Sequence, residues 1–420
     1  MADSFKVPTP GTRIERTYLV ERTLGQGAMG AVLLARDEAL DRRVAIKFVR
    51  PEAGVDDHVR ERVRFEAQLM AKVRNENVAG VYSYGELDGA PYFVMEYIDG
   101  EDLDSILARL NGEVLPRREG LRILGAICEG IHVIHEAGAV HGDIKPANVM
   151  IERATGRVVL TDFGAARHAR GVPREGSPRG TPAYIAPELL GHDAGELNLG
   201  VRADVYSLGV LAYEILTGRL PFEAPTVVGM LRAHLRQTPP EPSALNPELS
   251  PALDPVLLGA LQKNPASRTA SVDILRQQLF DTAAEVAATG RGLRFVVADD
   301  DPVFLTLARS LLKSAYAEAE IVCVNDGDAA LEAISQGMTS VLVLDLQMPK
   351  MPGVEVVRAL RDNPATRETP VVVVTGEGGA DDWRALSALG TEGFLVKPVD
   401  LGALLALIRR LVMPEPTSRV

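Results

Sequence analysis

The sequence has few cysteines and no long apolar run, and each of these absences excludes a class of protein. Its 420 residues include only 2 cysteines, Cys128 and Cys323, which are too few for the disulfide framework of a small secreted protein. No segment reaches the roughly 18 uncharged apolar residues of a membrane-spanning helix, and residues 1–10 lack the basic and then apolar pattern of a secretory signal. We therefore expect a reduced cytoplasmic protein with no membrane span.

An excess of basic residues is also missing. The chain carries 45 Lys and Arg residues against 57 Asp and Glu residues, which gives a net charge of -12. Proteins that hold the phosphate backbone of a nucleic acid need clustered positive charge, so we expect no direct nucleic-acid partner. The length of 420 residues exceeds what one hydrophobic core usually serves, and it predicts two domains.

The order of strand-like and helix-like patterns predicts two domains of different class. Strand-like runs fill residues 18–49 and 81–97, a helical pattern lies at 56–74, and a mostly helical pattern follows over 103–280. This order predicts a bilobal α+β domain with a small β-rich lobe and a larger helical lobe. The predicted boundaries are a flexible N-terminus at 1–11, a first domain at 12–281, a linker at 282–292, a second domain at 293–412 and a tail at 413–420.

The second domain shows apolar strands that alternate with helices. Its predicted strands are 294–298, 321–324, 341–344, 371–375 and 393–396. This alternation indicates a parallel sheet buried on both faces, and the flavodoxin-like doubly wound α/β order suits five strands. In the helix after the first strand, Val303, Leu307 and Leu311 mark the apolar face.

A glycine-rich hairpin near the N-terminus is suited to phosphate groups. Residues 25–32 fit the pattern G-x-G-x-x-G-x-V, and glycines let the backbone approach phosphate oxygens closely. The pattern alone is weak, but it joins two predicted strands, which is unlike a Rossmann turn. Lys47, in the sequence Val-Ala-Ile-Lys, matches the lysine that contacts the α- and β-phosphates in protein kinases.

Glu66 is the predicted partner of Lys47. It lies in the apolar stripe of the predicted helix at 56–74, whose other members are Val59, Val63, Met70 and Val73. A charged side chain in a buried stripe is costly unless it is paired, and Lys47 is the obvious cation. The alternative is that Glu66 lies at the rim of the helix.

The segment around Asp143 carries the predicted chemistry of phosphoryl transfer. Asp143 is the candidate base or orienter for a substrate hydroxyl, and Asn148 and Asp162 are candidate Mg²⁺ ligands because they offer hard oxygen atoms. A short D-x-K run is usually a solvated loop. That reading fails here because the related motifs occur together and in order, ending with Glu188, Asp204 and Arg268.

Residues 12–281 resemble the bacterial eukaryotic-like (Hanks-type) Ser/Thr protein kinases. The resemblance implies a protein substrate with Ser or Thr hydroxyls, and ATP with Mg²⁺ or Mn²⁺ as cofactors. It also implies that Lys145 neutralises the transferred phosphoryl group, that Arg268 pairs with Glu188, and that Met95 is the gatekeeper. The implied nucleotide site comprises Leu24, Gly25, Gly27, Gly30, Val32, Ala45, Lys47, the Glu96 carbonyl, the Ile98 amide and Asp102.

One departure from that family concerns activation. The residue before the catalytic aspartate is usually Arg, which pairs with a phosphorylated residue of the activation loop, but this chain has Gly142. Ser177 and Thr181 are the obvious hydroxyls of that loop, and Thr181 is expected to have a structural role near Asp143. We expect that phosphorylation of the loop is not required for activity. The alternatives are harmless drift and a partial loss of activity.

Three carboxylates mark a second site. Asp299 and Asp300 follow the first predicted strand of the second domain, and Asp345 follows the third. The ends of parallel strands open on one side of a sheet, so these groups would repel one another unless a divalent cation neutralised them. Each aspartate alone could cap a helix, but this explanation is poor for all three together with Thr375 and Lys397 at the ends of the last two strands.

Residues 293–412 resemble the receiver domains of response regulators. The resemblance makes Asp345 the phosphoacceptor and adds the Gln347 carbonyl to Asp299, Asp300 and Asp345 as Mg²⁺ ligands. Thr375, Phe394 and Lys397 would form the switch, with Phe394 in a place where Tyr is frequent. A cis peptide bond is expected between Lys397 and Pro398.

Three functions remain open from the sequence. The first is an active kinase whose output is tuned by phosphorylation of Asp345. The second is an ATP-binding pseudokinase scaffold whose receiver docks partners in a phosphorelay, and the third makes the receiver a phosphate sink. No histidine-kinase region is visible, so the donor to Asp345 would be a separate sensor histidine kinase, a phosphotransfer protein or a small phosphodonor. A homodimer is left open.

Overall fold

The structure, a computed structural model, describes residues 6–27, 30–49, 70–162, 182–190, 197–290, 292–376 and 389–412. The chain divides into two compact units, and each is described by itself. The first unit comprises Met1–Val114, Ile123–Pro240 and Leu257–Arg276, and the second comprises Leu115–Arg122, Glu241–Val256 and Gln277–Val420. Among the described residues, we find no helix with the length and apolar character needed to cross a membrane.

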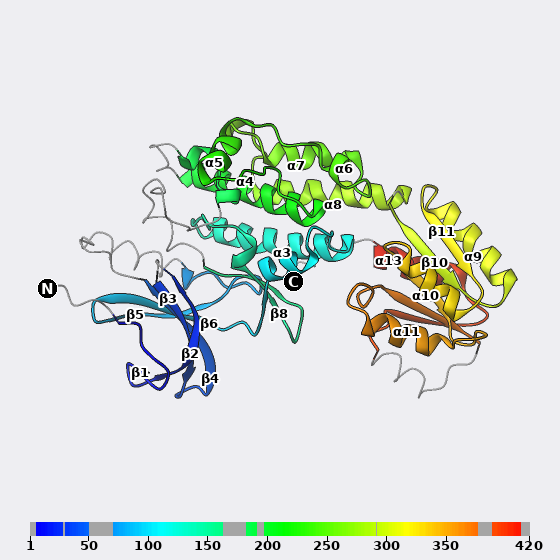
Figure 1. Ribbon diagram of the computed structural model, residues 1–420, viewed down its shortest axis with the longest axis horizontal. Coiled ribbons are helices and arrows are strands. Elements are labelled where there is room, and N and C mark those ends of the chain that lie inside the picture. Colours follow the sequence, from blue (N-terminus) through cyan, green and yellow to red (C-terminus); the bar gives the residue numbers. More distant parts are fainter. Residues whose placement is uncertain are drawn as a thin grey trace. The chain divides into compact units, whose positions relative to one another are not determined.

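A six-stranded antiparallel sheet forms the N-terminal part of the first unit (Figure 1). In spatial order its strands are β1 (Arg13–Ile14), β2 (Tyr18–Gly27), β3 (Gly30–Asp37), β4 (Arg42–Val49), β6 (Ala90–Glu96) and β5 (Val81–Leu87). Asp37 shapes the turn between β3 and β4, because its Oδ1 accepts the backbone N–H groups of Ala39 and Leu40, each at 3.2 Å. The strands predicted within 18–49 and 81–97 are confirmed.

Strand β4 separates core side chains from site side chains. Val44, Ile46 and Phe48 are fully buried in one hydrophobic cluster. Because side chains of a strand alternate between its two faces, Ala45 and Lys47 point to the opposite side of the sheet. The ammonium group of Lys47 therefore lies on the face of the sheet opposite to the cluster of Val44, Ile46 and Phe48.

The described residues of 103–280 are mostly helical, as predicted. A three-stranded sheet contains β7 (Gly100–Asp102), β8 (Val149–Glu152) and β9 (Val158–Leu160). The helices are α2 (Leu103–Leu110), α3 (Arg117–Glu136), α4 (Leu197–Thr217), α5 (Val227–Arg236), α6 (Pro242–Leu245), α7 (Asp254–Ala260) and α8 (Val272–Thr289). Short 3-10 helices lie at η1 (Pro146–Asn148), η2 (Pro182–Tyr184), η3 (Pro187–Leu190), η4 (Pro251–Leu253) and η5 (Pro265–Ser267).

The segment predicted as a linker is largely helical. Helix α8 runs to Thr289 and therefore continues through most of 282–292. Gly290 has a φ of +78°, and a Cβ there would lie 2.6 Å from the Cβ of Tyr316. A side chain at this position would be both strained and crowded, which explains a glycine where the helix ends.

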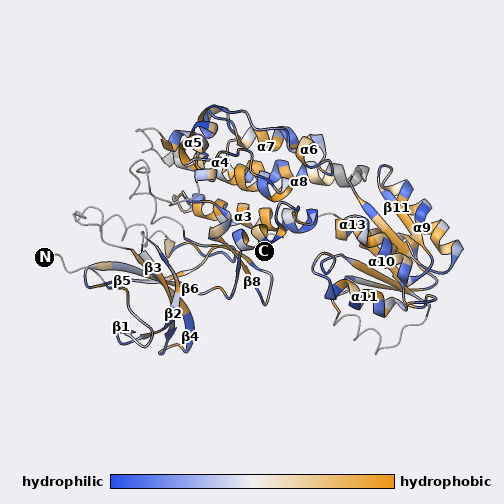
Figure 2. Ribbon diagram, in the orientation of Figure 1, coloured by the Kyte–Doolittle hydropathy of each residue, from blue (hydrophilic) through white to orange (hydrophobic). Residues whose placement is uncertain are grey.

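A five-stranded parallel sheet forms most of the second unit. Its order is β11 (Glu320–Val324), β10 (Arg294–Ala298), β12 (Val341–Asp345), β13 (Val371–Thr375) and β14 (Gly393–Val396). The described helices that follow its strands along the chain are α9 (Pro302–Ala315), α10 (Gly327–Ser335), α11 (Gly353–Asp362) and α13 (Leu401–Val412). The predicted strands and the doubly wound order are confirmed, and Figure 2 shows the strands of this sheet as mostly hydrophobic.

Both faces of this sheet are covered by helices. Helices α9 and α13 pack on one hydrophobic cluster, and α10 and α11 pack on the other (Figure 1). The apolar face predicted for α9 is wrong at two of its three positions: Val303 is 64% exposed and Leu307 is 47% exposed, whereas Leu311 packs partly buried against the core. The next stripe along the helix, which consists of Phe304, Ala308 and Leu312, faces the sheet instead.

Candidate functional sites

Asp143 contacts two polar side chains of the first unit, Lys145 and Asn148. Lys145 Nζ is 2.8 Å from Asp143 Oδ2, and Asn148 Nδ2 donates to the same oxygen at 3.1 Å. Asn148 Nδ2 also donates to the Asp143 backbone carbonyl at 2.7 Å, and Asn148 is buried on η1. The carboxylate of Asp143 is therefore fixed in orientation by one cation and one amide.

Asp204 on α4 holds the backbone just before Asp143. Its carboxylate accepts the N–H groups of His141 and Gly142, each at 2.8 Å, and it lies 2.8 Å from His135 Nε2. Burial acts to raise the pKa of Asp204, but the contact with His135 and the backbone N–H groups hold its pKa below the usual range. The sequence singled out Asp204 but missed His135, which lies 69 residues earlier in the chain.

Gly142 occupies a backbone conformation that favours glycine. Its φ is +75°, in the left-handed region, where a residue with a Cβ costs roughly 1–2 kcal/mol. The glycine therefore removes backbone strain at this position and also leaves the site without a guanidinium group there.

Lys47 reaches the other side of the same site. Its Nζ lies 3.0 Å from Oδ1 of Asp162, the residue that follows β9 and Thr161. The structure thus brings together Lys47, Asp143, Lys145, Asn148 and Asp162 on adjacent elements of the first unit. The predicted partner Glu66, and the predicted phosphorylation sites Ser177 and Thr181, lie outside the described residues.

The glycine-rich hairpin consists of the ends of β2 and β3. Gly25 pairs with Val32, which in turn pairs with Lys47 across the sheet. A Cβ added at Gly25 or Gly27 would have no atom within 4 Å, so these glycines border open space. Packing does not require glycine there, which is consistent with close approach of a ligand to the backbone.

The remaining residues of the predicted nucleotide site lie on neighbouring strands and turns. Ala45 is buried on β4, Leu24 is 37% exposed on β2, and Ile98 is buried just after β6. Asp102 has a structural contact that the sequence did not reveal: it caps α2, accepting the Ser105 N–H at 2.8 Å. Gly30 and Glu96 are the first residue of β3 and the last of β6.

Glu188 and Arg268 form the predicted ion pair. Arg268 Nη1 lies 2.7 Å from Glu188 Oε1, and Nη2 lies 2.9 Å from Oε2. The Arg268 side chain is fully buried, so the two parallel contacts compensate the charge that burial would otherwise leave unpaired.

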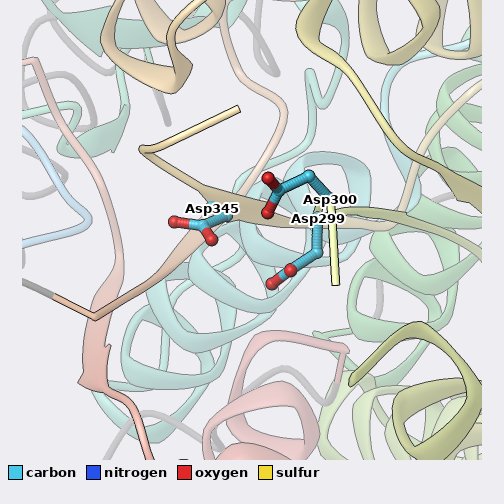
Figure 3. A group of neighbouring side chains, drawn as sticks. All are labelled: Asp299, Asp300 and Asp345. Carbon is cyan, nitrogen blue, oxygen red and sulfur yellow. The ribbon is translucent and has the colours of Figure 1, made fainter. Parts of the chain in front are cut away.

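The acidic group of the second unit lies at the ends of β10 and β12. Figure 3 shows the side chains of Asp299, Asp300 and Asp345 gathered at one point. One carboxylate oxygen from each lies within 4.8 Å of the others. Three hard oxygen donors at this spacing suit Mg²⁺, and Gln347 follows closely, with its N–H donating to Asp345 Oδ1 at 3.1 Å.

Lys397 is the cation beside these carboxylates. Its Nζ lies 2.6 Å from Asp345 Oδ2 and 2.8 Å from Asp299 Oδ2. Burial acts to lower the pKa of Lys397, but its contacts with the two carboxylates raise it overall. The Lys397–Pro398 peptide bond is cis, as predicted.

The predicted switch residues Thr375 and Phe394 lie on β13 and β14. Thr375 is fully buried at the end of β13, and its backbone carbonyl accepts the Lys397 N–H at 2.8 Å. Phe394 on β14 packs partly buried against the sheet. Sequence reasoning missed Gly353, where a Cβ would lie 2.3 Å from the Asp345 backbone oxygen. The Pro352-Gly353 pair at the start of α11 was the available signal for this close approach.

The buried charge of Asp299 should lower the stability of the second unit. Burial raises the pKa of Asp299, opposed mainly by Lys397. A carboxyl group with a raised pKa in the folded state favours folding at low pH, and this contribution is lost as the pH rises through that pKa. We therefore expect Asp299→Asn to raise the melting temperature of this unit at pH 7 by roughly 3–5 °C without Mg²⁺.

A thermal melt followed over a series of pH values measures this effect. The gain should shrink as the solution becomes acidic, because the wild-type carboxyl group, whose pKa is raised, becomes protonated. The matched control is Glu318→Gln, an exposed carboxylate of the same unit. A lower melting temperature for Asp299→Asn at pH 7 would contradict the account.

Comparison with known proteins gives two family matches. Residues 18–280 match the protein kinase domain, and residues 295–409 match the response regulator receiver domain. The chain is 39% identical over 283 residues to the serine/threonine-protein kinase PksC of Streptomyces coelicolor, covering 64% of this chain and 50% of that protein. It is 36% identical over 288 residues to PknB of Mycobacterium tuberculosis, covering 67% of this chain and 43% of that protein.

A solved structure extends the match to three dimensions. The PknI kinase domain of Mycobacterium tuberculosis is 30% identical, with a TM-score of 0.53, and the match covers 66% of this chain and 100% of that one. The chain spans about half the length of PksC and PknB. The residues that contact Asp143 and Asp162 lie within the stretch that matches the protein kinase domain, residues 18–280. The chain therefore belongs to the protein kinase family and carries a response regulator receiver domain at residues 295–409.

Proposed function

We propose that the chain is an ATP-dependent protein Ser/Thr kinase whose output depends on the phosphorylation of Asp345. The observation that carries the kinase part is the contact set of Asp143, whose carboxylate is bound by Lys145 and Asn148 within 3.1 Å. A pseudokinase scaffold would need neither this arrangement nor the Lys47–Asp162 pair at 3.0 Å. Incorporation of labelled phosphate from ATP tests the proposal.

The roles of the kinase residues follow from their contacts. When bound, ATP with Mg²⁺ or Mn²⁺ supplies the phosphoryl group. Asp143 would orient the Ser or Thr hydroxyl and accept its proton, while the ammonium of Lys145 offsets the charge of the transferred group. Asn148 would hold the cation together with Asp162, because its Nδ2 donates to Asp143 and its amide oxygen is the atom that could bind a cation. Lys47 would contact the phosphates.

The receiver residues would perform a different transfer. An oxygen of the Asp345 carboxylate would bond to phosphorus as the bond to the donor's leaving group breaks. Asp299, Asp300 and the Gln347 carbonyl would hold Mg²⁺, which supplies charge neutralisation when bound. Lys397, already 2.6 Å from Asp345, would then contact the new phosphoryl oxygens.

The donor to Asp345 is proposed to be a separate protein or a small phosphodonor. Asp143 is arranged for a hydroxyl acceptor with a proton to remove, whereas a carboxylate acceptor carries no such proton. Transfer from the kinase site to Asp345 is therefore chemically disfavoured. We propose a sensor histidine kinase or phosphotransfer protein as donor, a protein with Ser or Thr as substrate, and the cytoplasm, where ATP is available, as location.

Activation-loop phosphorylation is not expected to be an obligatory switch. Gly142 supplies no guanidinium group that could bind a phosphate bidentately. We therefore expect Ser177→Ala to retain kinase activity within about twofold of the wild type. Steady-state rates on a protein substrate measure this. Loss of most activity, restored by Ser177→Glu, would show that another basic residue takes the place of the missing arginine.

A further inference from the structure

Arg157 stands out among charged residues that the proposed reaction does not use. It immediately precedes β9 and has partners on three separate segments. Its Nη2 pairs with Glu96 Oε1 at the end of β6, its Nη1 donates to the Glu76 carbonyl at 3.4 Å, and its Nε lies 3.4 Å from Glu152 Oε2. One guanidinium group thus joins β6, the segment before β5, and β8.

Glu96 transmits this contact to the backbone. While one oxygen of its carboxylate pairs with Arg157, the other accepts the Gly80 N–H at 3.3 Å. The Glu96 N–H donates in turn to the Gly80 carbonyl at 2.8 Å. The Glu96 peptide is therefore held from its side chain and from its backbone, and its position depends on Gly80 and Arg157.

The segment that contains Gly80 is itself bonded to β9. The Ala79 N–H donates to the Leu160 carbonyl at 2.9 Å, and the Leu160 N–H donates to the Asn77 carbonyl at 2.8 Å. Asn77 Nδ2 also donates to the Val158 carbonyl at 2.8 Å. Since Asp162 follows β9 closely, one hydrogen-bonded frame runs from Glu96 to the strand that leads to Asp162.

Helix α3 packs closely against this hydrogen-bonded frame. A Cβ at Gly130 would lie 2.8 Å from the Asn77 carbonyl oxygen and 2.8 Å from Leu160 Cδ1. The absence of a side chain at Gly130 therefore lets the segment before β5 lie directly against α3.

We propose that Arg157 is a positioning residue that fixes the Glu96 end of β6 for nucleotide binding. This inference rests on the proposed kinase function, in which the Glu96 carbonyl binds adenine. Arg157 acts through the Glu96 side chain and contacts none of the groups assigned to ATP or Mg²⁺. Its loss is therefore expected to weaken nucleotide binding and to leave the transfer step nearly unchanged.

The test compares Arg157→Gln with the control Arg153→Gln in the full chain. Arg153 is an exposed arginine between the same two strands. For Arg157→Gln we expect KM for ATP, and Kd for a fluorescent ADP analogue, to rise about fivefold, because the pair is partly exposed. We expect kcat to change less than about twofold, and Arg153→Gln to match the wild type.

Two further variants separate positioning from folding. Arg157→Lys keeps a cation near Glu96 and should recover part of the affinity. Glu96→Gln should have an effect similar to that of Arg157→Gln, and the double variant should be no worse than either single one, since both remove the same contact. If Arg157→Gln fails to fold, Glu96→Gln still tests the inference.

Specific results would overturn the inference. Unchanged KM and Kd in Arg157→Gln would do so, as would additive losses in the double variant. A lower melting temperature with a proportional loss of kcat and unchanged Kd would show a structural role alone. If the wild type binds ADP but transfers no phosphate, the kinase proposal fails, whereas the ADP measurements still decide the role of Arg157.

Discussion

Asp143→Asn is expected to reduce phosphate incorporation from ATP by roughly 10²- to 10⁴-fold. The amide cannot accept the proton of a substrate hydroxyl, although it can still accept hydrogen bonds from Lys145 and Asn148, which contact the carboxylate at 2.8 and 3.1 Å. The backbone anchored by Asp204 should therefore stay in place. Autophosphorylation with labelled ATP measures the loss, and acid hydrolysis should release phosphoserine or phosphothreonine from the wild type.

Nucleotide affinity separates this result from misfolding. Asp143 serves the hydroxyl and not the adenine, so Kd for an ADP analogue should stay within about twofold of the wild-type value. Asp104→Asn, an exposed carboxylate on α2, is the matched control and should label normally. Undiminished labelling of Asp143→Asn would remove the kinase assignment of this residue.

Asp345→Asn is expected to eliminate phosphorylation of the receiver by a small acyl phosphate in the presence of Mg²⁺. The wild type should form an acyl phosphate, which is stable in acid and labile in base, because the acceptor is a carboxylate. Asp345 is the carboxylate that lies closest to Lys397 Nζ, at 2.6 Å, and the amide of asparagine has no nucleophilic oxygen of comparable charge. Labelling followed by alkaline treatment measures the effect.

Two variants make this result specific. Asp300→Ala should also prevent labelling, because it removes one of the three oxygen donors grouped within 4.8 Å. Asp328→Asn, an exposed aspartate in the first turn of α10, should label normally. A label that survives alkali and persists in Asp345→Asn would instead show phosphorylation of a hydroxyl.

The receiver fold could be predicted closely because its signals are local. Each strand is a short apolar run, and Val371–Thr375 and Gly393–Val396 were predicted with the bounds that the structure shows. The face of α9 could not be decided in this way. Val303 and Leu307 form one apolar stripe, and Phe304 and Ala308 form another stripe one residue later. Only the direction in which the helix leaves its cap at Asp301 determines which stripe meets the sheet.

The site residues likewise include some that local motifs predict and some that only long-range contacts reveal. Motifs predicted Lys47, Asp143, Asn148 and Asp162, because each has a fixed spacing to its neighbours in the chain. The frame around Arg157 had no such signal, since its contact with Glu96 joins residues 61 apart. The predicted linker at 282–292 includes Gly290 and Gly292, and α8 runs to Thr289, just before the first of these glycines.

We expect the state of Asp345 to set the output of the kinase. Kinase rates of the full chain are compared with and without beryllofluoride, which mimics the phosphoryl group on Asp345, and Asp345→Asn serves as the control that the mimic cannot modify. A regulatory coupling of about 1–3 kcal/mol predicts a change of roughly 5- to 150-fold in the wild type and no change in the variant. Equal rates for the wild type in the two states would contradict the claim, and the receiver would then be a docking module for other proteins.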